Sequence, residues 1–160
     1  MRRATFRFLF GRLGCYLAAV ATAYLLASIL ATQAVVHSLA GMGVAVGLRD
    51  RLAMTLQDLA GLADMFLPMV AFALLVAFMA AALLNRWLYR WRDLLYAVAG
   101  GAAIVTIHLT LHFAFGITPL AIARSVGGLA LQALAGALGG LAYLGLIRRQ
   151  GGVVRAGDLG

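Results

Sequence analysis

Charged residues divide this chain into four long uncharged stretches, and that pattern predicts its fold. With histidine counted as neutral, the stretches contain 36, 21, 30 and 23 residues, at 13–48, 65–85, 94–123 and 125–147. A helix rises about 1.5 Å per residue and needs about 20 residues to cross a hydrocarbon core of about 30 Å. Each stretch therefore predicts one membrane span, and the spans are expected at about 15–38, 65–84, 94–114 and 127–147.

The first and third stretches are too long for one span and too short for two. Their excess is expected to form the outer connections, Gly41 to Leu48 and Gly116 to Ala123. The sequence thus predicts an all-α membrane protein, a compact four-helix bundle forming one domain over residues 1–149. Residues 150–160 contain four glycines and no apolar period, which favours a disordered cytoplasmic tail.

One segment outside the spans has helical periodicity. Leu48, Leu52, Leu56 and Leu59 recur at helical spacing among charged and polar residues, shortly before Gly61. A helix with one apolar and one polar face lies flat at a membrane interface. We therefore expect a short amphipathic helix on the outer surface.

Composition and charge strengthen the membrane assignment and set an orientation. The chain is 64% hydrophobic and 11% charged, whereas soluble domains carry roughly a quarter charged residues. All 13 basic residues are arginines, and ten of them fall on the side of the termini. Arginine-rich loops stay in the cytoplasm, so we expect a multi-pass protein of a bacterial-type inner membrane with both termini cytoplasmic.

A secretory signal is the competing interpretation of the first span. The basic start, the apolar run from Leu17 and the small residues around Ala31 resemble one. The run is long for a signal peptide, so the first span is expected to remain, and cleavage stays the alternative.

Polar residues at membrane depth are costly and mark a network or a site. The sequence places a group of them in the outer half of the bundle: Gln33, His37, Asp64, His108, His112, Arg124 and Gln132. His108 and Gln132 are expected at similar depth, and Asp64 and Arg124 are expected to pair at the outer mouth. Hydrogen bonds between spans contribute about 0.6 to 2 kcal/mol each, so the group is interpreted first as a structural network.

Three ligand chemistries remain open for the same residues, although no cofactor is predicted. His108 and His112 lie one helical turn apart, as helix-borne zinc ligands do. His37 and His112 are the pair at matched depth for a bis-histidine haem, and His108 with Gln132 would hydrogen-bond a quinone. A proton path through His108 finds no carboxylate in the inner half.

Small residues predict where the spans pack. Gly128, Gly136 and Gly140 repeat at multiples of four in the fourth span, and Gly101 lies near the inner end of the third. Such rows let helices approach closely. The row is expected to serve packing within the chain, with a membrane-protein partner or a second copy of the chain as the alternative.

The sequence contains no nucleophile elbow, phosphate-binding glycine loop or acidic pair. Arg86 to Arg92 interleaves arginines with aromatics, which between two spans indicates an interfacial belt rather than a nucleic-acid site. We therefore expect a protein that is not an enzyme, an accessory or packing subunit of a membrane complex. A haem-, quinone- or metal-binding bundle is the alternative, and a small transporter is the third.

Overall fold

The computed structural model describes residues 2–116, 122 and 125–157, and the described part is helical with short connections. Helix α1 spans Arg2–Gly41, α2 spans Leu48–Leu84, α3 spans Arg92–Phe115 and α4 spans Val126–Gly157. A single 3-10 turn, η1 at Tyr89–Trp91, precedes α3. The loop expected at Gly116 to Ala123 and its Arg124 neighbour lie largely outside the described residues.

Within the described residues, four helices are long and apolar enough to cross a membrane, which confirms the prediction of an all-helical chain with four candidate spans. The qualifying segments are Gly11–Gly41, Leu48–Leu84, Tyr89–Ala114 and Val126–Gln150. Each contains one of the four predicted spans. The spacing of charged residues was therefore sufficient to find all four.

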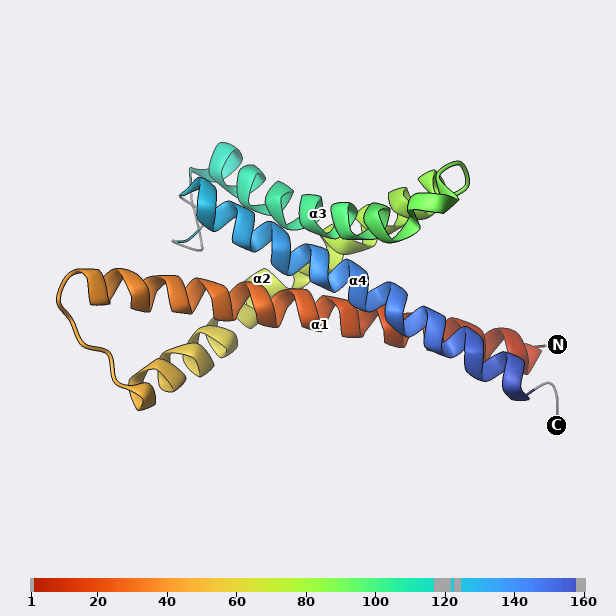
Figure 1. Cartoon of the computed structure of the whole chain (residues 1–160), viewed down its shortest axis with the longest axis horizontal. Coiled ribbons are helices and arrows are strands. Elements are labelled where there is room, and N and C mark those ends of the chain that lie inside the picture. Colours follow the sequence, from red (N-terminus) through yellow and green to blue (C-terminus); the bar gives the residue numbers. More distant parts are fainter. Residues whose placement is uncertain (1, 117–121, 123–124, 158–160) are drawn as a thin grey trace.

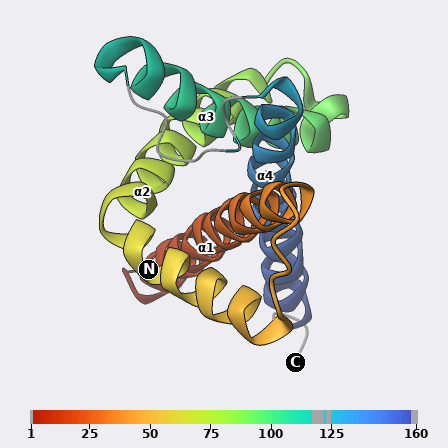
Figure 2. The same cartoon turned by 90° about the vertical axis from the view of Figure 1, so that its left-hand side faces the viewer.

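The helices pack in a ring in chain order, with α1 against α2, α2 against α3, α3 against α4, and α4 back against α1. Helices α1 and α4 run in opposite directions along the long axis, and α1 begins at the end where α4 finishes (Figure 1). Helix α2 follows an arc from beside α1 to beside α3 (Figure 2). Pro68 lies within that arc, where its missing N–H allows a helix to bend.

The expected separate amphipathic helix is wrong in one respect, because residues 48–60 form the first turns of α2. A lone glycine such as Gly61 costs a helix only about 1 kcal/mol, and packing compensates for this here. Leu59 and Leu62 pack against the core, whereas Leu48, Leu52 and Leu56 are exposed. One continuous helix thus carries both the amphipathic segment and the second span.

Helix α4 also continues beyond the expected start of the tail, through Gly157. Its extension lies alongside the first part of α1, since Gln150 Nε2 donates to the carbonyl oxygen of Gly11 at 3.0 Å. The tail prediction is therefore wrong for residues 150–157, and residues 158–160 lie outside the described part.

The closest helix contact joins α3 to α4 through glycines. A Cβ added at Gly100 would lie 2.2 Å from the carbonyl oxygen of Gly136, and one at Gly136 would lie 2.2 Å from that of Gly100. A Cβ at Gly140 would lie 2.1 Å from the carbonyl oxygen of Tyr96. No side chain fits at these three positions. Helix α3 of the same chain therefore packs against Gly136 and Gly140 of the predicted glycine row.

The other predicted small residues have different neighbours. A Cβ at Gly101 would lie 3.0 Å from the carbonyl oxygen of Ala133, which extends the contact between α3 and α4. Gly128 instead faces the preceding connection, where a Cβ would lie 1.8 Å from the carbonyl oxygen of Ile122.

A row of small residues on α1 faces α4. Cys15, Ala19, Ala23, Ala27 and Ala31 recur every four residues and are buried. Gly139 packs onto this row, because a Cβ there would lie 2.8 Å from the Ala23 Cβ. Helix α4 therefore uses Gly136 and Gly140 toward α3 and Gly139 toward α1.

Gly136→Ala is expected to destabilise the bundle by about 3 kcal/mol, because the added methyl group meets backbone atoms that cannot rotate away. The matched control is Gly145→Ala in the same helix, where no heavy atom lies within 4 Å of the added Cβ. Thermal unfolding in detergent should show a lower midpoint for Gly136→Ala than for the unchanged protein. The midpoint of the control should not fall. Equal midpoints would contradict the α3–α4 contact.

Candidate functional site

Among the residues that the structure describes, four polar side chains are buried inside the bundle, and we call them the polar core. They are Ser28 and Thr32 of α1, His108 of α3 and Gln132 of α4, with exposed fractions of 0, 0, 3 and 0%. Gln132 Nε2 donates to the carbonyl oxygen of Ala27 at 3.0 Å, and His108 lies beside the Gln132 side chain. The polar core therefore connects α1, α3 and α4.

A hydroxyl of the polar core also reaches α2. The Thr32 hydroxyl donates to Asp58 Oδ2 at 2.7 Å, and the carbonyl oxygen of Ser28 lies 3.1 Å from the same hydroxyl. Asp58 is half-buried. A carboxylate that accepts a hydrogen bond between spans stabilises their register, so this contact fixes the start of α2 against α1.

Several atoms of the polar core have no hydrogen-bond partner among the described residues. They are Ser28 Oγ, Gln132 Oε1, and both ring nitrogens of His108. The His108 ring instead stacks on Phe66 of α2, with the ring centroids 5.7 Å apart and the planes at 30°. Buried polar groups are normally paired, so these four atoms are exceptions within the bundle.

The structure brings together two of the seven residues expected to form one network, His108 and Gln132. Gln33 and His37 of α1, Asp64 of α2 and His112 of α3 are exposed, and Arg124 lies outside the described residues. The expected depth match of His108 and Gln132 is therefore met. The other four described residues lie on the surface of the bundle, because each points away from the ring of helix contacts.

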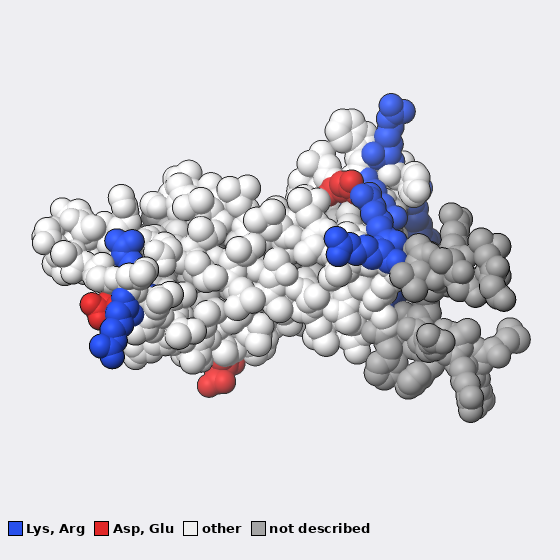
Figure 3. All heavy atoms as spheres, turned by 60° about the horizontal axis from the view of Figure 1, so that its bottom comes forward, with Lys and Arg blue, Asp and Glu red and all other residues white. Residues whose placement is uncertain are grey.

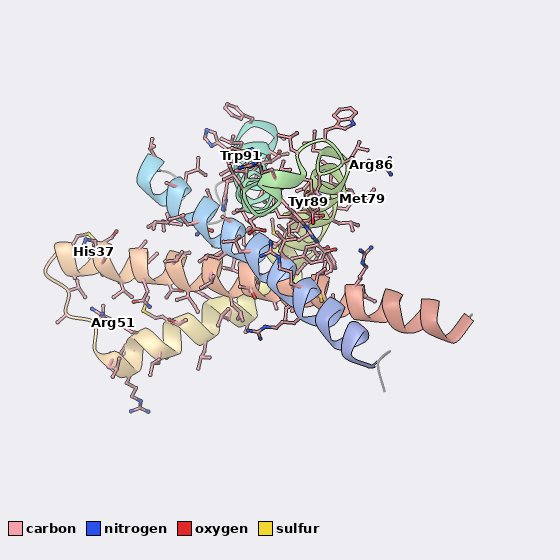
Figure 4. The ribbon with its side chains drawn as sticks, turned by 45° about the vertical axis from the view of Figure 1, so that its right-hand side comes forward. His37, Arg51, Met79, Arg86, Tyr89 and Trp91 are labelled. Carbon is pink, nitrogen blue, oxygen red and sulfur yellow. The ribbon has the colours of Figure 1, made fainter. Side chains whose placement is uncertain are left out.

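The ligand-binding residues are placed as follows. His108 is buried and His112 is exposed, although they lie one turn apart on α3. His37 is exposed near the end of α1 (Figure 4). Within the described ranges, no three His, Cys, Asp or Glu side chains lie close enough to hold one metal ion.

Asp64 occupies an unexpected position, in a groove between α1 and α2. The groove has a volume of about 530 Å³, and its walls are Leu17, Val20 and Ala21 of α1 with Ala63, Leu67, Pro68 and Ala71 of α2. Asp64 lies 16 residues from the start of α2 and 20 from its end, about 24 and 30 Å at the helical rise. Asp64 thus lies near the middle of α2, and its expected place at the outer mouth stays a prediction, because about 30 Å from the end of the helix matches the thickness of a hydrocarbon core.

Charge is otherwise concentrated at the two ends of the molecule. The arginines gather there, and the middle is mostly uncharged, with acidic atoms visible on its surface (Figure 3). In the described part of the chain, no hydrogen bond or salt bridge engages the Asp64 carboxylate. An exposed carboxylate thus lies within an apolar, membrane-spanning surface.

Sequence reasoning missed three of these residues. Asp58 was assigned to the polar face of a surface helix, and Ser28 and Thr32 were not singled out. A signal was available in their spacing, because Ser28 and Thr32 lie four residues apart beside the Ala27 and Ala31 row. Hydroxyls that share the face of a small-residue row point into a helix contact.

No protein-family model, curated protein or solved structure matches this chain. The residues and their geometry therefore carry the functional argument.

Two substitutions separate the roles of the polar core. His108→Met should leave stability within about 1 kcal/mol, because the thioether keeps the volume and the aromatic contact with Phe66 while removing the unpartnered nitrogens. Gln132→Ala should cost about 2 kcal/mol or more through a lost hydrogen bond and a cavity.

Thermal unfolding in detergent measures both changes, and Leu134→Ala on the exposed face of α4 is the control. A loss for His108→Met as large as that for Gln132→Ala would contradict this division.

Proposed function

We propose that this protein is a non-catalytic accessory subunit of a membrane complex, and that it docks a transmembrane helix of its partner in the α1–α2 groove. The observation that carries the proposal is the exposed Asp64 carboxylate inside that apolar groove. The occupant is a helix that carries an arginine, a lysine or another strong hydrogen-bond donor at the level of Asp64.

The charge of Asp64 supports a partner of this chemistry. An ionisable group within a span is costly and normally faces a cation, a hydrogen-bond donor or water. The described arginines lie toward the two ends of the bundle (Figure 3), and Asp93 already pairs with Arg148. A hydrogen-bond donor or cation from another protein would therefore pair with the Asp64 carboxylate.

The shape of the groove supports a helix as the occupant. Helices associate in lipid by close packing of small residues, and Ala21, Ala63 and Ala71 line this groove. The glycines of α3 and α4 are already filled from within the chain. The α1–α2 face combines small residues with a polar group in need of a partner, which are the two features that promote helix association.

The arginines support the orientation included in this proposal. Arg86, Arg90, Arg92 and Arg148 lie at the ends of spans near the start of α1, whereas Arg49 and Arg51 begin α2 at the other end. The arginine-rich side of a membrane protein stays in the cytoplasm. We propose a bacterial-type inner membrane with both termini cytoplasmic.

A second candidate function is supported by the polar core. The unpartnered atoms of Ser28, His108 and Gln132 would bind a small molecule with both donors and acceptors, such as a quinone headgroup. This candidate predicts a preparation with a bound mass of a few hundred daltons that His108→Ala removes. Native mass spectrometry from mild detergent measures that mass directly.

The docking proposal predicts site-specific crosslinking in native membranes. A photo-reactive amino acid at Leu17 or Ala21, on the α1 wall of the groove, should give a discrete protein adduct. The same group at Val98, an exposed position of α3, should label lipid alone. Asp64→Asn should reduce the protein adduct at least tenfold, and Asp64→Glu should retain it, because the contact depends on the carboxylate charge.

Mass spectrometry of the crosslinked peptide supplies the stricter test, because the partner segment must be a transmembrane helix with a basic or donor residue. Adducts of equal yield from all three positions, or adducts unaffected by Asp64→Asn, would contradict docking in the groove. Lipid labelling alone at Leu17 and Ala21 would contradict docking as well.

A further inference from the structure

A second pocket lies at the arginine-rich end, between the start of α3 and the end of α4. It has a volume of about 540 Å³, and its basic and aromatic walls come from Tyr89, Arg90, Trp91, Arg92 and Arg148. Asp93 also lines it and pairs with Arg148. Three arginines against one aspartate leave the pocket positively charged, so it is suited to an anion.

The binding groups in this pocket are available to a ligand. Arg92 Nε is buried and has no hydrogen-bond partner among the described residues. The start of α3 lies at the same pocket, but its Arg92 backbone N–H already donates to the carbonyl oxygen of Tyr89. The donors for a ligand are therefore the arginine side chains, which bind phosphate through charge-assisted hydrogen bonds.

The location of the pocket indicates where such a phosphate comes from. The pocket lies where the candidate span Tyr89–Ala114 begins and near the end of the span Val126–Gln150, which is the level of lipid headgroups. Trp87, Tyr89 and Trp91 are 86, 73 and 58% exposed, as aromatics are at that level. Arg86, Tyr89 and Trp91 are in the upper part of Figure 4, whereas His37 and Arg51 are at its left.

We infer that this pocket binds the phosphate of an anionic phospholipid, such as phosphatidylglycerol. Arg90 and Arg92 would contact the phosphate, and the exposed Leu94 and Leu88 beside them would contact the acyl chains. Basic pockets between transmembrane helices bind anionic headgroups in this way. The inference is independent of the docking proposal, because it concerns a different face and needs no protein partner.

Native mass spectrometry with added lipid tests the inference. The full-length chain should retain phosphatidylglycerol in preference to phosphatidylcholine. The double variant Arg90→Gln with Arg92→Gln should bind phosphatidylglycerol roughly 30-fold more weakly, since each arginine near an anionic surface contributes roughly fivefold. Arg49→Gln with Arg51→Gln removes the same charge from the opposite end and should leave binding unchanged.

Two further measurements keep the result interpretable. Arg90→Lys with Arg92→Lys should retain most binding, and its unfolding midpoint should match that of the glutamine variant, which separates ligand loss from misfolding. Inorganic phosphate serves as the lipid-free probe. Three outcomes would each overturn the inference. The chain could retain both lipids equally, or the Arg49 and Arg51 variant could lose as much lipid binding as the Arg90 and Arg92 variant. Inorganic phosphate could also bind as tightly as the lipid.

Discussion

The bundle depends on one contact, the close approach of the α3 and α4 backbones at Gly100, Gly136 and Gly140. A Cβ at any of these positions would lie within 2.2 Å of a carbonyl oxygen of the other helix. Lipid provides no hydrophobic force between spans, so packing density determines which faces meet. Because α4 is held so closely to α3, its neighbouring face, with Gly139 and Gln132, is directed at α1. The polar core forms where these two contacts converge.

The sequence predicted the helix content and the four spans because both depend on local composition. A charge inside a span is costly wherever the helix lies, so the gaps between charges count the spans. Helix ends were predicted less well. The helices continue through Gly61 and Gly151, although the local pattern there favours a break.

Depth and direction limited the prediction of the site. Counting residues from the outer boundary assumes straight helices perpendicular to the membrane, whereas α2 begins at Leu48 and follows an arc. Asp64 therefore lies near the middle of a helix longer than the predicted span. His108 and Gln132 were predicted as neighbours because they lie on adjacent antiparallel spans whose connection is short. Thr32 and Asp58 meet only because α2 starts early, which the span boundaries did not indicate.

The division of polar groups between inside and outside follows from their charge. Ser28, Thr32, His108 and Gln132 bear no obligatory charge, so a bundle can enclose them at the cost of a few unpaired hydrogen bonds. A lone carboxylate enclosed in the same way would lose far more solvation energy, and Asp58 is tolerated because it is half-buried and accepts from Thr32. Asp64 has neither advantage and lies on the exposed surface of α2. Internal packing does not require a carboxylate at that position, and lipid does not favour one. Folding stability does not explain Asp64, so Asp64 is the residue most informative about what contacts this protein.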